Sequence, residues 1–100
     1  MKTTAQILTE ARALIDTPEK WTQKTSSRDC KGSPLERATD PNAVCFCSLG
    51  ALDKAARNFV ESDRAYKFLY KLTSGDVSGF NDTHSHSEVM ELFNRAISLA

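Results

Sequence analysis

The residues best suited to chemistry lie in two short stretches of this chain. Cys45 and Cys47 form one pair, and Asp82 precedes His84 and His86 in the other. Thiolates and imidazoles are common zinc ligands, which makes the cysteines and histidines a candidate set. Zinc ligands close in sequence are usually separated by two to four residues, however, and helical side chains two apart point about 200° from each other. We therefore predict no metal and no cofactor, and interpret the cysteines as small core residues.

Nucleophilic catalysis is an alternative use of the same side chains. Cys47 could attack a substrate with His84 or His86 as its base, and a thiolate at a helix start gains from the helix dipole. With Asp82, this would give a small hydrolase or a metal-dependent enzyme. No known nucleophile motif surrounds either cysteine, so we assign no catalytic residue.

A polar pocket is expected beside the last helix. Asn81 and Asp82 are predicted to lie in a turn before that helix, where such side chains commonly accept bonds from the first N–H groups. The same stretch could form a polar wall closed by aromatic residues, with N–H groups available to an anion. The candidate pocket consists of Trp21, Cys47, Phe80, Asn81, Asp82 and His84.

A basic face is the second candidate surface. Between positions 54 and 71, five basic residues accompany two acidic ones, with Tyr66 and Tyr70 interleaved. The basic residues are Lys54, Arg57, Arg64, Lys67 and Lys71. Such a face suits nucleic acid or an acidic protein, although most charged helix faces are simply solvated.

Composition narrows the class of protein. One hundred residues are enough for one domain, which we expect to span 1–100. Thirteen basic and thirteen acidic residues give a net charge of +0, which disfavours strong nonspecific binding to nucleic acid. No apolar run or leader-like segment indicates a membrane. Three cysteines are an odd number, which argues against a disulfide framework and favours the cytoplasm.

The first part of the chain predicts two helices and a loop. Thr3 and Gln6 form a capping box before an apolar stripe of helical spacing. Pro18 is expected to open a short second helix that carries Trp21. Residues 25–40 are rich in turn formers and lack periodicity, which predicts a long loop.

The middle of the chain predicts one long helix after Pro41, because apolar residues recur from Val44 to Val60. The start of this run, up to Leu49, also fits a buried strand. Gly50 is expected to allow another backbone to approach closely.

Two further helices complete the prediction. Ser62 and Asp63 are expected to cap the fourth, and Ser85 with Glu88 forms a capping box for the fifth. The expected fold is all-α, a single compact domain of about five helices with a long loop between the second and third.

The chain also resembles a family of small uncharacterised bacterial and phage proteins, a domain of unknown function. The resemblance runs from about Ile7 to Leu99 and is carried by Ile15 through Trp21, Arg28-Asp29-Cys30-Lys31-Gly32, Ala43 through Leu52, and Phe80-Asn81-Asp82 leading into Glu88-Val89. Cys47, Asn81 and Asp82 fit the family pattern, whereas Cys45, His84 and His86 depart from it. The resemblance supports a structured pocket around Trp21, Cys47, Asn81 and Asp82 and implies no activity, cofactor or substrate.

These observations together predict a small non-catalytic protein-binding module of bacterial or phage origin. Its expected partner is another protein, and no membrane is expected. The alternatives are the enzyme using Cys47, Asp82 and His84, and a nucleic-acid-binding protein using the basic face of the fourth helix.

Overall fold

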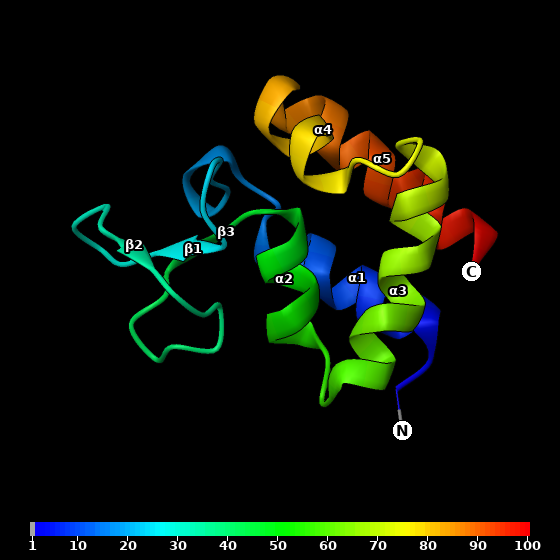
Figure 1. Ribbon diagram of the computed structural model, residues 1–100, viewed down its shortest axis with the longest axis horizontal. Coiled ribbons are helices and arrows are strands. Elements are labelled where there is room, and N and C mark those ends of the chain that lie inside the picture. Colours follow the sequence, from blue (N-terminus) through cyan, green and yellow to red (C-terminus); the bar gives the residue numbers. More distant parts are fainter. Residues whose placement is uncertain (1) are drawn as a thin grey trace.

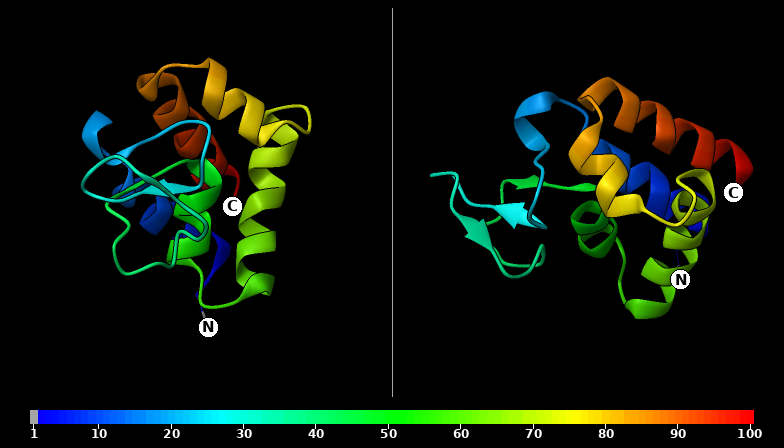
Figure 2. Two further views of the ribbon diagram at one scale, coloured as in Figure 1. Left: turned by 60° about the vertical axis from the view of Figure 1, so that its left-hand side comes forward. Right: turned by 45° about the horizontal axis from the view of Figure 1, so that its top comes forward.

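The computed structural model describes residues 2–100 and builds them from helices and one small sheet (Figure 1). In chain order the elements are α1 (Thr4–Leu14), the 3₁₀ turn η1 (Pro18–Lys20), β1 (Ser27–Arg28), β2 (Pro34–Leu35), β3 (Cys45–Phe46), α2 (Ser48–Ala55), α3 (Phe59–Leu72), α4 (Val77–Thr83) and α5 (His86–Leu99). The helices gather into one body, and the sheet projects from it beside α2, as the turned views also show (Figure 2).

One core joins the helices. The first helix packs against α2, α3 and α5, and its Ile7, Leu8 and Ala11 are fully buried. Leu69 of α3 and Phe93 of α5 belong to the same buried cluster. The Cα radius of gyration is 12.1 Å, close to the value of about 13 Å expected for a domain of this length.

The two capping boxes predicted from the sequence are confirmed. Thr3 Oγ1 accepts a bond from the Gln6 N–H at 3.1 Å, and Gln6 Oε1 accepts from the Thr3 N–H at 2.7 Å. Ser85 and Glu88 make the same reciprocal pair at the start of α5. Each box satisfies N–H groups that a helix start otherwise leaves without partners.

The expectation of a purely α-helical fold needs correction, because the chain also forms a three-stranded antiparallel sheet in the order β2-β1-β3. Ser27 of β1 pairs with Leu35 on one side and with Phe46 on the other. The predicted second helix is only the turn η1, and Trp21 follows it in a parallel bridge to Phe46. Within the 25–40 segment, β1 and β2 are therefore ordered strands.

The predicted long helix up to Val60 is wrong. The first part of this stretch forms the strand β3 and the next part forms α2. A short non-helical connection then separates α2 from α3. Cys47 separates β3 from α2, and Asn58 separates α2 from α3. Both residues have an extended backbone and cap the helix that follows them. Asn58 accepts a bond from the Glu61 N–H at 3.0 Å, so α3 begins at Phe59 and not after Ser62.

Asn81 and Asp82 lie inside a helix and not in the predicted turn. The short helix α4 begins after Asp76, whose carboxylate accepts a bond from the Gly79 N–H at 3.0 Å. Asn81 and Asp82 occupy its last turn, which directs their side chains at neighbouring segments.

Gly50 permits the close backbone approach that the sequence predicts. A Cβ at this position would overlap the backbone carbonyl of Ser26, which precedes β1. The sheet therefore packs directly on α2. Among the helices of residues 2–100, none combines the length and apolar character that crossing a membrane requires.

Candidate functional site

Asn81 joins three separate segments of the chain. Its side chain is 1% exposed, and its Oδ1 accepts bonds from Trp21 Nε1 at 2.8 Å and from the Ser48 N–H and hydroxyl at 3.0 and 2.7 Å. Its Nδ2 donates to the Thr22 carbonyl at 3.0 Å. A buried amide with this many partners fixes the elements around it. Asn81 thus holds α4, the start of α2 and the Trp21 segment together.

Asp82 also binds the segment that follows Trp21. Its Oδ1 accepts a bond from the Lys24 N–H at 2.8 Å. Lys24 has a φ of 69°, in the left-handed region that few non-glycine residues occupy. Gln23 adds a bond from its side-chain amide to the Asn81 carbonyl at 3.0 Å. Residues 22–24 are therefore bound closely to the end of α4.

Cys47 caps α2 with its sulfur atom. Its Sγ accepts a bond from the Gly50 N–H at 3.3 Å. Burial nevertheless raises the pKa of the thiol above its ordinary value of 9.0 and outweighs the bonds from Gly50 and Leu49, and the nearby charges of Asp82 and Asp53 raise it further. The thiolate that the helix dipole was expected to favour is therefore disfavoured.

Three of the six predicted pocket residues come together around one hollow. Cys47, Asn81 and Asp82 line a cavity of about 240 Å³, together with Lys24 and Ser78. The full lining is Lys24, Thr25, Ser26, Cys47, Leu49, Ser78, Asn81 and Asp82. Trp21 is not among the lining residues and joins them through its bond to Asn81.

The remaining predicted residues lie elsewhere. Phe80 and His84 line a separate hollow, where their rings stack 3.7 Å apart. His84 Nδ1 lies 2.9 Å from the Phe80 carbonyl, and His86 Nε2 lies 2.6 Å from the Ile15 carbonyl. Because a carbonyl only accepts, both ring nitrogens donate these bonds.

The zinc set considered from the sequence is not assembled. In residues 2–100, no three His, Cys, Asp or Glu side chains are placed to hold a metal ion.

The predicted basic face is only partly continuous. Arg64, Lys67 and Lys71 are exposed at helical spacing along α3. Lys67 Nζ pairs with Asp63 Oδ2 at 3.2 Å. Lys54 and Arg57 lie outside α3, at the end of α2 and in the connection that follows it.

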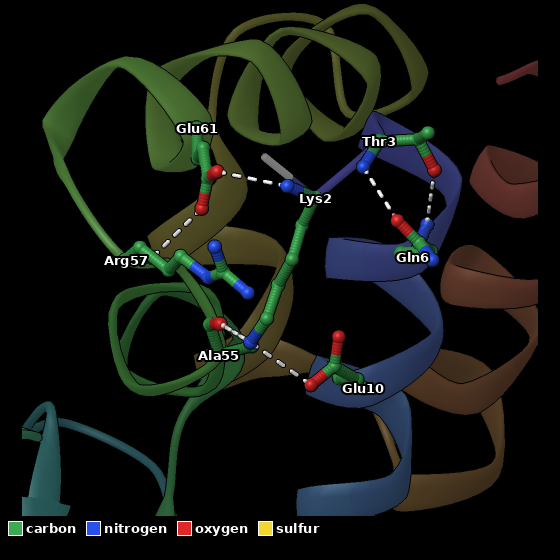
Figure 3. A network of polar contacts seen from close by, with 7 residues as sticks. All are labelled: Lys2, Thr3, Gln6, Glu10, Ala55, Arg57 and Glu61. Atoms are coloured by element: carbon green, nitrogen blue, oxygen red, sulfur yellow. Dashed lines mark hydrogen bonds and ion pairs between the residues drawn. The ribbon is translucent and has the colours of Figure 1, made fainter.

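A buried carboxylate organises this connection, and the sequence did not predict it (Figure 3). Glu61 is 2% exposed and accepts bonds from the N–H groups of Arg57 at 2.8 Å and Lys2 at 3.0 Å. The bond from the Arg57 N–H is the main reason that the pKa of Glu61 is lowered. The Lys2 ammonium in turn donates to the Ala55 carbonyl at 2.7 Å and pairs with Glu10 at 3.0 Å.

A groove between α2 and α3 is the site feature that the sequence missed. It has a volume of about 370 Å³ and is lined by Leu49, Leu52, Asp53, Phe59, Ser62, Asp63 and Tyr66. The sequence placed Val44, Phe59 and Val60 in an apolar core stripe, but they are 51%, 81% and 49% exposed. Asn58, a strong helix-capping residue just before Phe59, was the signal that could have placed Phe59 at an exposed helix start.

These features define a small, mainly helical domain with a three-stranded antiparallel sheet at one end and shallow hollows on either side of α2. The chain belongs to the Family of unknown function (DUF6197), whose model matches residues 1–99. No curated protein and no solved structure matches the chain. The resemblance to a family of unknown function is thus confirmed, while bacterial or phage origin stays a prediction.

Proposed function

We propose that this chain is a non-catalytic protein-binding module and that the α2–α3 groove is its binding surface. The observation that carries the proposal is the exposure of Phe59, which is 81% accessible at the edge of an apolar groove. Burying a phenylalanine side chain stabilises a complex by about 1.5–3 kcal/mol. Aromatic side chains of this kind commonly serve as anchors at protein interfaces.

The spacing of the lining residues makes the groove a regular surface. Leu49, Leu52 and Asp53 share one face of α2, because residues three and four apart on a helix are neighbours. Phe59, Ser62, Asp63 and Tyr66 form the facing stripe on α3 by the same rule. Two helix faces that meet across a short connection form a groove suited to a helical or extended segment of a partner.

The connection that presents Phe59 is held rigidly. The Asn58 cap fixes the start of α3, and Glu61 binds the Arg57 N–H. The Ser62 hydroxyl donates to Asp53 at 2.8 Å and so ties α3 to α2 across the groove. A surface fixed before binding loses little conformational entropy when a partner docks.

The residues of the enzyme alternative give less support to catalysis. Burial raises the pKa of the Cys47 thiol, and Asp82 is engaged with the Lys24 N–H. His84 lines a different hollow from Cys47. We also propose a cytoplasmic location, because all three cysteines are free thiols. We further propose a bacterial or phage origin, which rests on the family resemblance alone.

Selection from a random peptide display library tests this function. Wild-type protein is the bait, the Phe59→Ala variant is used for counter-selection, and Val60→Ala is the control for loss of an exposed apolar side chain outside the groove. We expect selected peptides to bind Phe59→Ala at least about tenfold more weakly than wild type, and Val60→Ala like wild type.

Mapping the selected peptides by ¹⁵N chemical shifts locates the surface. Perturbations should concentrate at Leu49, Leu52 and Tyr66. Failure to enrich any peptide that prefers wild type over Phe59→Ala would contradict the proposed function. Perturbations confined to the sheet would show that the groove is not the binding surface.

A further inference from the structure

On the basis of the function proposed above, we infer that the partner segment is basic and amphipathic: a short helix with apolar residues on one face and Lys or Arg beside them. The groove residues themselves point to this composition. Its accessible apolar lining comes from Leu49, Phe59 and Tyr66, with Leu52 buried beneath them at 1% exposed, and its charged lining consists of carboxylates alone, Asp53 and Asp63.

Asp53 is the stronger of the two recognition groups. It follows Leu52 on the groove face of α2, and its Oδ1 accepts a bond from the neutral Ser62 hydroxyl. Within the part of the chain that the structure describes, no basic side chain pairs with it. Asp53 is exposed, so a cation of a docking partner can reach its carboxylate, and the docked segment would then shield the pair from water.

Asp63 provides a second carboxylate on the opposite side of the groove. Its partner Lys67 is an exposed residue one turn further along α3, at 3.2 Å. Exposed ion pairs of this type contribute little to stability, so a cation of the partner can replace Lys67 at small cost. The groove therefore offers one carboxylate on each helix to a basic segment.

The hollow next to the groove contains a further carboxylate, that of Asp82. Leu49 lines both this groove and the hollow that contains Asp82, so the two hollows are neighbours. The charges of Asp82 and Asp53 both help burial to raise the pKa of the Cys47 thiol, so each carboxylate lies within electrostatic reach of it. Lys24 is the one basic residue among the residues that line the two hollows.

The length of the groove sets the size of the segment. Phe59 and Tyr66 lie seven positions apart on α3, which is a rise of about 10 Å along the helix. This distance matches two turns of a partner helix that inserts apolar residues at positions i, i+3 or i+4, and i+7.

Fluorescence anisotropy with two labelled model peptides tests the inference. Both are amphipathic and about 14 residues long, roughly four helical turns, with leucine at identical positions. One carries lysine at the polar positions and the other glutamate. We expect the lysine peptide to bind at least about tenfold more tightly, with an affinity that falls as salt rises.

Variants separate charge from apolar contact. Asp53→Asn keeps an acceptor for Ser62 and should weaken the lysine peptide by about three- to tenfold. Glu36→Gln removes an exposed carboxylate outside the groove and should have no effect. Phe59→Ala should weaken the lysine peptide by at least about tenfold while the circular dichroism spectrum stays unchanged.

The outcomes distinguish the inference from the function on which it rests. If the two peptides bind equally well and Phe59→Ala weakens both, the inference of a basic partner is wrong, whereas the proposed protein-binding function is supported. No binding of either peptide, or binding that Phe59→Ala leaves unchanged, counts against both. A wild-type dimer in sedimentation that Phe59→Ala dissociates would identify a second copy of this chain as the occupant and overturn the basic segment.

Discussion

The amide of Asn81 shows how one residue can determine the position of several segments. Its oxygen receives bonds from Trp21 and Ser48, and its nitrogen donates to Thr22. Removing the amide leaves the buried Ser48 donors and the half-buried indole N–H without a partner, which is more costly than the loss of an exposed bond.

We therefore expect Asn81→Ala to lower the free energy of unfolding by about 2–4 kcal/mol. Urea denaturation followed by circular dichroism measures this change. Asn42→Ala, at an exposed position, is the control and should change the free energy of unfolding by less than about 0.5 kcal/mol. A similar small loss for Asn81→Ala would mean that water or rearranged neighbours satisfy the donors.

The thiol of Cys47 should react slowly despite its place at a helix start. Burial raises its pKa above the ordinary value of 9.0, so the thiolate fraction at neutral pH is reduced. Cys30 is exposed and provides a comparison in the same molecule. In a time course with iodoacetamide near pH 7.5, peptide mass mapping should find Cys30 modified well before Cys47.

The cysteine comparison has an internal control in denaturant, where burial is lost and the two rates should converge. In the folded protein, the rate at Cys47 should still be rising as the pH passes 9.0, because a raised pKa delays the pH at which the thiolate fraction levels off. Rapid alkylation of Cys47 at neutral pH would instead restore the nucleophile hypothesis.

At the scale of elements, the connection between α2 and α3 depends on the ionised state of Glu61. The bonds from the Arg57 and Lys2 N–H groups lower its pKa below the ordinary value of 4.5. A carboxyl whose pKa is lower in the folded state contributes stability above its unfolded pKa, and this contribution is lost as the pH falls through the folded value.

The Glu61→Gln variant tests this dependence. Urea unfolding between about pH 6 and pH 3 should give a free energy that falls less steeply on acidification than in wild type, because the variant has no charge to lose. Part of the wild-type slope should persist, since the pKa of Glu88 is also lowered, mainly by the Ser85 N–H. Identical slopes for the two proteins would show that Glu61 does not couple to folding.

The elements also explain what a sequence can predict. The first and last helices were predicted correctly, because each combines a capping box with a long apolar stripe. The strands β1 and β2 were missed since two residues are too few to show an alternating pattern, whereas β3 lies in the stretch for which a buried strand was the alternative. The helix α2 was merged with β3 because its cap is the sulfur of Cys47, a residue type that does not usually mark a helix start.

The candidate site was predictable to a smaller extent. Its polar residues near Asn81 were identified by type, but their partners are distant in the chain: the bond from Trp21 spans 60 residues and those from Ser48 span 33. Rules based on residue spacing apply to neighbours in the sequence and therefore cannot predict such contacts. The exposure of Phe59 could not be predicted either, because apolar residues occur on protein surfaces as well as in cores.

For the whole molecule, charge balance governs the nucleic-acid alternative. The chain carries 13 basic and 13 acidic residues, and Lys67 of the basic face is paired with Asp63. We expect no measurable binding of a labelled single-stranded oligonucleotide at about 0.15 M salt. Binding that falls steeply with salt and weakens in an Arg64→Ala, Lys71→Ala double variant would favour the alternative.

The bond between Trp21 and Asn81 also has a consequence for the order of folding. It closes a loop of 60 residues, and closing long loops is entropically unfavourable and slow. The contacts between α2 and α3, which follow each other in the chain, span much shorter separations and can form earlier. We therefore expect the Trp21 segment to dock on α4 late and to open early, so that the amides of residues 21–24 exchange with solvent while the helical core is still protected.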